Sequence, residues 1–133
     1  MQGSMVYNRT MTINDPNLEN TRAQMRKGLL EYCIMLTIAR AEAYASDILK
    51  QLKEDDLIVV EGTLYPLLSR LRVDGLLDYV WKESNAGPPR KYYSLTPTGR
   101  KTLEQLKTTW DQLTKSINSL IKKHEPRNTT FSK

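Results

Sequence analysis

The side chains best suited to contact another molecule lie in one segment, Glu61-Gly-Thr-Leu-Tyr-Pro-Leu-Leu-Ser-Arg-Leu-Arg-Val-Asp-Gly75. At about 100° per residue in a helix, its leucines gather on one side and small, hydroxyl and cationic residues on the other. The leucine side holds Leu64, Leu67, Leu68 and Leu71, and the opposite side holds Gly62, Thr63, Pro66, Ser69, Arg70 and Val73. The outer side carries no acid, so it can approach a polyanion closely.

A hairpin is predicted directly after this helix, and its second strand is basic. Leu77, Tyr79 and Trp81 occupy alternate positions, which is the pattern of a strand with one apolar face. Residues 84–89 are expected to form a turn, and residues 90–95 a return strand. Between residues 82 and 101 one acid, Glu83, accompanies the cations Lys82, Arg90, Lys91, Arg100 and Lys101. Such a cluster can be a solvated surface, but its place beside the helix favours binding of a polyanion.

A helix followed by a basic hairpin is the layout of a winged helix-turn-helix DNA-binding domain. We expect a first helix from Asn20 or Thr21 to about Ala41 and a second from about Tyr44 to Lys53. The last helix begins at Thr96-Pro97, with a threonine cap and proline at its first position, and runs to about His124. The predicted fold class is mainly α with a small β-hairpin: a winged helix-turn-helix plus a long C-terminal dimerisation helix.

The last helix carries a regular apolar stripe. Its members recur in steps of three and four, which is a heptad pattern: Leu103, Leu106, Trp110, Leu113, Ile117 and Leu120. A helix of roughly 40 Å is longer than a small domain can cover. The alternative is a helix that folds back on its own core. We favour a homodimer, in which an identical chain covers the stripe.

These patterns predict four regions along the chain. Residues 1–20 are expected to hold a tag remnant and a flexible arm, and residues 21–95 the winged helix domain. Residues 96–125 form the dimerisation helix, and residues 126–133 a flexible tail.

The composition fits one soluble globular domain. Of 133 residues, 39% are hydrophobic and 26% charged, and the net charge of +5 mildly favours acidic partners. No apolar run is long enough to span a bilayer, so no membrane partner is expected. The single cysteine, Cys33, cannot form an internal disulfide. We therefore expect a cytoplasmic protein.

Motifs for catalysis or metal binding are missing from the sequence. It has no phosphate-binding glycine-rich loop, no CxxC pair and no HExxH, and its one histidine, His124, has no cysteine or acid cluster around it. We expect no enzyme activity, no metal and no cofactor.

Three segments resemble the PadR family of bacterial transcriptional regulators. They are Gly62-Thr-Leu-Tyr-Pro-Leu-Leu-Ser-Arg-Leu71, Asp74-Gly-Leu-Leu77 and Arg90-Lys-Tyr-Tyr-Ser-Leu-Thr96, in the order and spacing of that family. The resemblance covers about Gln24 to Lys123 and, with a single last helix, points to the short-tailed branch. It implies a homodimeric repressor whose third helix enters the major groove and whose wing reaches the adjacent groove or backbone.

The resemblance also implies which residues contact a double-stranded DNA operator. They are Thr63, Tyr65, Pro66, Ser69 and Arg70 on the helix and Arg90 and Lys91 at the wing, to which the basic cluster adds Lys82. Alternatively, Tyr65 is a tyrosine at the edge of the core and Pro66 only stiffens the helix. The wing reads Gly87-Pro-Pro-Arg90 where family members often carry Gly-Arg-Pro-Arg, so a strong wing contact is in question.

Some relatives bind flat aromatic compounds between helices at the dimer interface. The resemblance therefore implies a ligand pocket at Trp110 for a small planar aromatic effector, whereas Trp110 could instead be a packing residue of the stripe. Two other functions stay open. One is a winged-helix module for protein–protein assembly without specific DNA binding, which apolar anchors on the outer helix face would indicate. The other is a small-molecule-binding protein that acts through its dimer interface.

Overall fold

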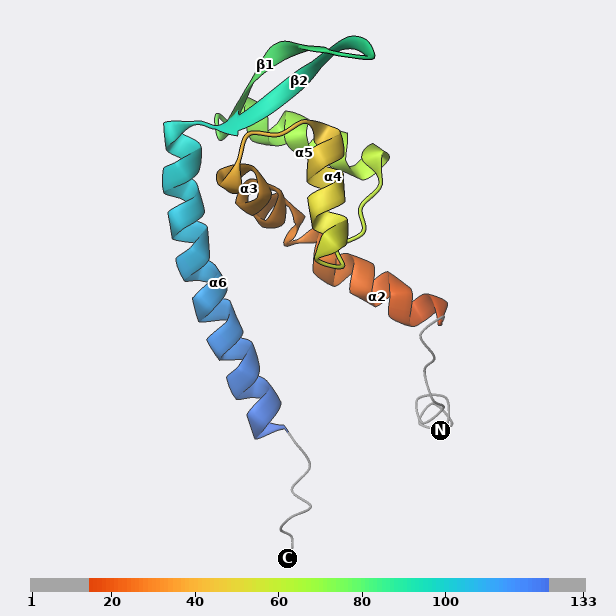
Figure 1. Ribbon diagram of the computed structural model, residues 1–133. Helices are drawn as coiled ribbons and strands as arrows, with labels where there is room; N and C mark the ends of the chain where they lie inside the picture. The colour runs from red at the N-terminus through yellow and green to blue at the C-terminus, as the bar shows by residue number, and fades with distance from the viewer. Residues whose placement is uncertain (1–14, 125–133) are drawn as a thin grey trace, which may run out of the picture.

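The computed structural model describes residues 15–124, which form a helical domain capped by one β-hairpin. Figure 1 shows α3, α4 and α5 gathered beneath the hairpin, while α6 runs away on one side and α2 on the other. The predicted fold class is confirmed as mainly α with a small β-hairpin in a winged helix-turn-helix, followed by one long C-terminal helix. The expectations for residues 1–14 and 126–133 lie outside the described residues. The elements are α2 (Pro16–Lys27), α3 (Leu30–Arg40), α4 (Ala45–Glu54), α5 (Glu61–Val73), β1 (Leu77–Ser84), β2 (Gly87–Leu95) and α6 (Pro97–Lys123).

The N-terminal part of the fold differs from the prediction of one helix beginning at Asn20 or Thr21. The chain is already helical from Pro16, because the Asp15 carboxylate accepts hydrogen bonds from the amides of Asn17 and Leu18 at 2.8 and 3.3 Å. The helix then ends at Gly28, and α3 starts separately at Leu30. No residue of α2 is buried, so this helix adds nothing to the core of its own chain.

The hydrophobic core lies between α3, α4, α5 and the base of the hairpin. Its fully enclosed side chains come from three helices and one strand: Ile34, Met35, Ile48, Leu64, Leu68 and Leu77. The predicted inner face of α5 is confirmed, since Leu64, Leu68 and Leu71 are buried and Leu67 is half-buried. The core therefore fixes which side of α5 turns toward solvent.

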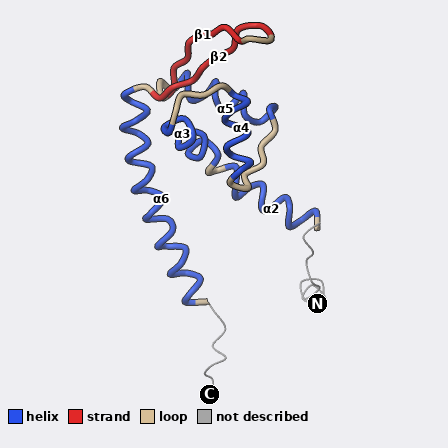
Figure 2. The backbone as a smooth tube through the Cα atoms, in the orientation of Figure 1, coloured by secondary structure: helices blue, strands red, loops and turns tan. Residues whose placement is uncertain are grey.

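The hairpin is antiparallel and longer at its second strand than predicted. Leu77 pairs with Leu95 at the base and Ser84 with Gly87 at the tip, so only residues 85 and 86 form the turn. Prolines 88 and 89, expected in the turn, belong to β2. At the base, the backbones of Ala43 and Tyr93 exchange hydrogen bonds of 3.1 and 2.9 Å. Figure 2 shows the hairpin rising above the helices, tied to them at this end.

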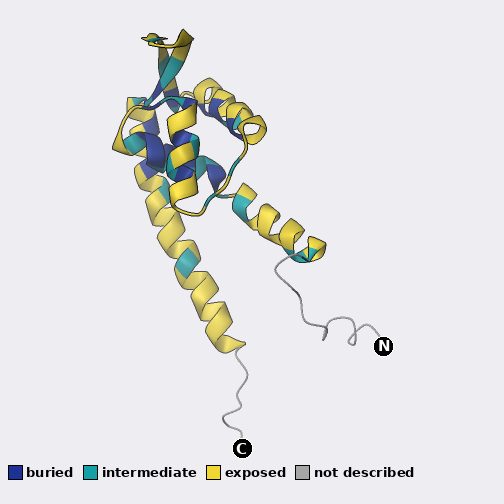
Figure 3. Cartoon of the chain, turned by 45° about the vertical axis from the view of Figure 1, so that its right-hand side comes forward, coloured by how far each residue is buried: buried dark blue, intermediate teal, exposed yellow. Residues whose placement is uncertain are grey.

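The long helix α6 touches the domain only through its first turns. Thr96 caps it as predicted, accepting a hydrogen bond from the Gly99 amide at 2.9 Å. Leu103 is 3% exposed and belongs to the core, and Leu106 packs against it. Beyond them every residue of the helix except the half-buried Thr114 is exposed, up to its last residue (Figure 3).

Candidate nucleic-acid interface

The outer face of α5 is nearly free of large apolar groups. Because Leu64, Leu68 and Leu71 are buried, Gly62, Pro66, Ser69 and Val73 turn away from the core. Val73, at 80% exposed, is the single large apolar side chain among them. A surface of small and hydroxyl side chains lets a helix come close to the floor of a DNA groove.

The two flanks of α5 face different neighbours. On one flank, Tyr65 borders a hollow beneath the hairpin, and the Arg72 guanidinium lies 4.8 Å from the centre of the Tyr79 ring. On the other flank, Thr63 borders a hollow that α2 and the start of α3 also line, and Arg70 reaches Glu31. The helix is thus braced on both sides, with its outer face left open.

Arg70 is held by an acid from a different helix. Its Nε donates a hydrogen bond to Oε2 of Glu31 at 2.6 Å. This hydrogen bond and the charge of Glu31 raise the pKa of Arg70 above its ordinary value. An arginine guanidinium is cationic at physiological pH even without such a shift. The Arg70 side chain is nevertheless 62% exposed, which leaves most of it available to a ligand.

Each predicted cation of the wing lies over an aromatic ring. The Lys82 ammonium is 4.1 Å from the centre of the Tyr92 ring, and the Arg90 guanidinium is 4.8 Å from that of Tyr44. Lys91 lies 4.5 Å from the centre of the Tyr79 ring. Such contacts hold flexible cations in place without neutralising their charge. The wing therefore presents positive charge in fixed positions.

A hollow of about 340 Å³ joins the wing, α5 and the start of α4. At its edge, Arg90 donates a hydrogen bond to the Ser46 hydroxyl at 3.4 Å. The hollow brings together four predicted DNA-contacting residues, Tyr65, Ser69, Arg90 and Lys91, with the aromatic side chains of Tyr44, Trp81 and Tyr93. Of the other predicted residues, Thr63 and Arg70 lie on the opposite flank of α5, Pro66 lies on its open face, and Lys82 pairs across the hairpin with Arg90.

The tyrosines of this region differ in burial. Tyr92 and Tyr93, which are adjacent on β2, point to opposite faces of the strand, and Tyr65 lies on α5. Tyr93 is 4% exposed, and burial raises the pKa of its hydroxyl. Tyr92 points to the opposite face of β2 and packs against Tyr44, with ring centres 5.0 Å apart and ring planes tilted by 58°. Tyr65 is 49% exposed, so it is not a core residue.

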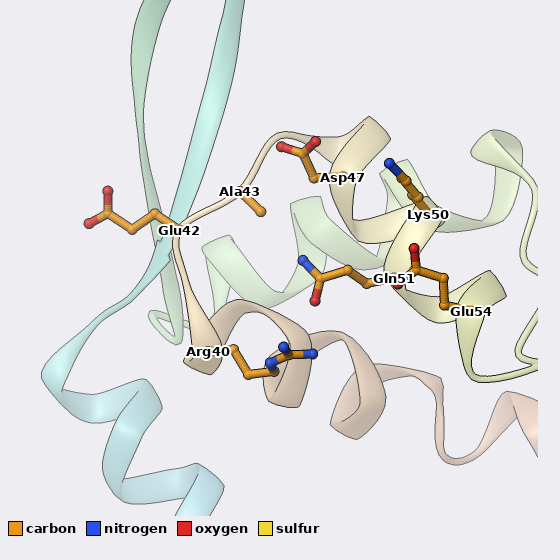
Figure 4. Close-up of a pocket in the computed structure, with 7 residues that line it drawn as sticks. All are labelled: Arg40, Glu42, Ala43, Asp47, Lys50, Gln51 and Glu54. Carbon is orange, nitrogen blue, oxygen red and sulfur yellow. The ribbon is translucent and has the colours of Figure 1, made fainter.

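A second hollow, on the far side of α4, has a different character. Figure 4 shows Arg40 at the end of α3, Glu42 on the following loop, and Asp47, Lys50 and Glu54 along α4. Three acids offset two cations here, and Asp47 also accepts a hydrogen bond from the Tyr44 amide at 3.1 Å. This mixed surface is poorly suited to a polyanion, so the candidate interface is confined to the side of α5 and the wing.

The stripe on α6 is shorter than predicted. Leu103 was assigned to a dimer interface, but it is buried in the core of its own chain, and Leu106 is half-buried against that core. Both therefore anchor α6 to the winged domain. The remaining members are exposed by 40 to 57%: Trp110, Leu113, Ile117 and Leu120, joined by the unpredicted Ile121 at 55%.

Sequence reasoning missed several residues of this region. Glu31, Ser46 and Arg72 contact Arg70, Arg90 and Tyr79 respectively, and none of them carries a motif. Tyr44, expected as the start of the second helix, supports Arg90 from a half-buried position. The only available signal was the high number of tyrosines near the basic strand.

Metal and membrane sites are not found in the described part of the chain. Between residues 15 and 124, histidine, cysteine and acidic side chains form no group that could hold a metal ion. Within the same residues, no helix combines the length and apolar character needed to cross a bilayer. Cys33 is half-buried, and desolvation raises the pKa of its thiol.

Comparison with known proteins identifies the family. The model of the transcriptional regulator PadR-like family matches residues 34–105, which include α5 and the whole wing. The chain belongs to the PadR-like family of transcriptional regulators. The predicted membership is confirmed, and at the level of the family the chain is a DNA-binding regulator of transcription and not an enzyme.

Solved structures of PadR-like regulators share this fold. A PadR-like transcription factor from Bacteroides fragilis is 57% identical, with a TM-score of 0.66 over 76% of this chain and 98% of the other. A PadR-family regulator from Eggerthella lenta is 29% identical, with a TM-score of 0.74 over 80% of this chain and 94% of the other. Among relatives found by sequence, a transcriptional regulator from Mycobacterium tuberculosis is 30% identical over 74% of this chain and 87% of its own length.

Proposed function

We propose that this PadR-family chain is a homodimeric repressor that recognises an inverted-repeat operator. In this proposal α5 enters the major groove, and the wing lies on the neighbouring backbone or groove. Thr63, Tyr65, Pro66, Ser69 and Arg70 are the helix contacts. Lys82, Arg90 and Lys91 are the wing contacts. A bacterial regulator of this kind works on chromosomal DNA, so its proposed location is the cytoplasm.

One observation carries the proposal: the open face of α5 adjoins a wing whose cations are held in place. Small and hydroxyl side chains on α5 allow close approach to base edges, which specify sequence. Lys82, Arg90 and Lys91, fixed over tyrosine rings, supply charge for phosphate groups, which position the protein. The two kinds of contact thus come from adjacent elements.

The same face argues against a protein–protein assembly module. An assembly surface usually concentrates aromatic and aliphatic anchors at its centre. Among the outward residues of α5, only Val73 and the flanking Tyr65 are large hydrophobic side chains that are exposed. Ser69 and Pro66 between them offer no anchor, so DNA is the better-supported partner.

The exposed stripe on α6 supports the dimer. Trp110, Leu113, Ile117 and Leu120 lie on one side of the helix and have no partner among the described residues of the chain. A second copy would bury them around a two-fold axis and set the two α5 helices against one face of DNA.

Trp110 supports a proposed response to an effector. If the two-fold axis passes near it, the two indoles form an apolar slot for a planar aromatic compound. A compound bound there would shift the angle between the two wings and so change the affinity for DNA.

Selection from a pool of randomised duplexes tests the proposal, because the operator is unknown. The purified chain should enrich an inverted repeat whose half-sites are about one helical turn apart, near 34 Å. Enrichment of no sequence over the starting pool would overturn the proposed recognition. Enrichment of single, unpaired half-sites would overturn the proposed dimeric arrangement.

A further inference from the structure

The ion pair between Arg70 and Glu31 connects the proposed DNA-reading helix to the first turn of α3. The two residues are 39 positions apart in sequence, and their side chains meet at 2.6 Å. The other ion pairs in the described part of the chain, Arg26–Glu19 and Lys107–Glu104, each lie within one helix. A pair that spans two helices can fix the direction of a side chain relative to the whole domain.

The pair is a poor candidate for a purely stabilising contact. Arg70 is 62% exposed and Glu31 33% exposed, and ion pairs in contact with water add little to stability. Moreover, a carboxylate beside the proposed DNA surface repels phosphate groups and weakens general attraction to DNA. An acid at this position therefore contributes something other than affinity for DNA.

The geometry of the contact indicates that this contribution is the direction of the Arg70 side chain. Glu31 accepts a hydrogen bond from the Nε–H of Arg70, which is the guanidinium donor closest to the main chain. Both terminal nitrogens of the guanidinium form no hydrogen bond within the described residues, and they can act together as a fork. Such a fork matches the O6 and N7 acceptors of guanine in the major groove.

We propose that Glu31 is a positioning residue that orients Arg70 toward a guanine edge and thereby raises selectivity for sequence. The inference rests on the proposed function, because it requires α5 to lie in the major groove. Glu31 holds the Nε edge of the guanidinium and so fixes the direction of its two terminal nitrogens. Arg70 would then gain less from a phosphate group and more from a correctly placed guanine.

Three substitutions at Glu31 separate positioning from charge. Glu31→Gln keeps the length and an acceptor oxygen but removes the charge, whereas Glu31→Asp keeps the charge but shortens the reach. Glu31→Ala removes both. If position matters, Glu31→Gln retains the base preference and the other two lose it. If only the charge matters, Glu31→Asp retains the base preference and Glu31→Gln loses it. That result would overturn the inference.

The measurement is selection from the same randomised duplex pool, followed by affinity for duplexes changed at single base pairs. Glu31→Ala and Glu31→Asp should reduce discrimination at one guanine per half-site by about tenfold. Their affinity for duplexes of unrelated sequence should be unchanged or higher. Arg70→Ala should lose the same preference, and the double variant Glu31→Ala with Arg70→Ala should lose no more.

Failure of the inference and failure of the proposed function give different results. A wild-type chain with no base preference refutes the proposed function. The positioning role alone is refuted by a different result. In that case the wild-type chain has a base preference, Arg70→Ala loses it, and Glu31→Ala and Glu31→Asp both retain it. Circular dichroism of each variant checks folding. Aspartate and glutamine differ little in size from glutamate, so the base preferences of Glu31→Asp and Glu31→Gln can still be compared if Glu31→Ala does not fold.

Discussion

Gly99 on α6 lies directly against the backbone of Leu76: a Cβ at Gly99 would stand 2.1 Å from the Leu76 carbonyl oxygen. The Thr96 amide donates a hydrogen bond to the same oxygen at 3.1 Å, and the Thr96 hydroxyl donates one to the Gly75 carbonyl at 2.6 Å. The start of α6 is therefore fixed to the turn before β1 at a point where only glycine fits. This crossing sets the direction in which α6 leaves the winged domain.

Gly99→Ala should destabilise the fold. The obstructing atom is backbone and cannot rotate away, so we expect the free energy of unfolding to fall by about 1–3 kcal/mol. Gly62→Ala is the matched control, because no atom lies within 4 Å of its added Cβ and it sits inside a helix. It should be neutral or stabilise by up to about 1 kcal/mol. Urea denaturation at one protein concentration measures both, and equal midpoints would contradict this account of the crossing.

The wing cations should contribute to DNA binding on all sequences alike. Lys91→Ala removes one proposed phosphate contact, so the plot of log binding constant against log salt concentration should become shallower by about one. Lys107→Ala is the control, since it removes the same charge from α6, where Lys107 pairs with Glu104 at 3.2 Å. A salt dependence altered equally by both variants would assign the effect to net charge and not to the wing.

The exposed stripe of α6 should hold the dimer together. Leu113→Glu with Ile117→Glu places two charges where a partner helix would bury apolar surface, so the protein should become monomeric. Light scattering measures the mass of this variant. The control, Thr108→Glu with Ser119→Glu, adds the same charges on the opposite side of the helix and should leave the dimer intact. A stripe variant that stays dimeric places the interface elsewhere.

Trp110 should report on an effector if one binds at the dimer axis. Titration with planar aromatic and planar cationic compounds should quench tryptophan fluorescence in the wild-type chain, because a stacked ligand contacts the indole directly. Trp81, 61% exposed on the wing, is the other tryptophan and serves as an internal reference in Trp110→Ala. Quenching that persists in Trp110→Ala, or is missing from both proteins, would leave Trp110 as a packing residue.

The elements that hold the candidate interface could be predicted because local patterns determine them. The leucines of α5 recur at helical spacing, β1 alternates, and Thr96-Pro97 marks the start of α6. The break between α2 and α3 was not predicted, because one glycine costs a helix only about 1 kcal/mol and Gly28 alone does not indicate a helix end.

The contacts between elements could not be predicted in the same way. Heptad spacing alone does not say where α6 leaves the core, so Leu103 and Leu106 looked like members of one continuous stripe. The pairing of Arg70 with Glu31 depends on how α3 and α5 pack, as does the position of Arg90 over Tyr44. Such contacts arise from tertiary structure, which a single sequence does not display.

The most direct test of the account compares Arg70→Ala with Arg40→Ala in a DNA-binding titration. Fluorescence anisotropy with the selected operator and a scrambled duplex, at several salt concentrations, gives both affinity and selectivity. Arg70 lies on the α5 flank, whereas Arg40 lies in the mixed-charge hollow behind α4. Arg70→Ala should weaken operator binding by about 1–3 kcal/mol and reduce its preference over the scrambled duplex. Arg40→Ala should bind like wild type. Equal losses in both variants, or a wild-type chain that binds both duplexes equally, would contradict recognition of DNA by α5.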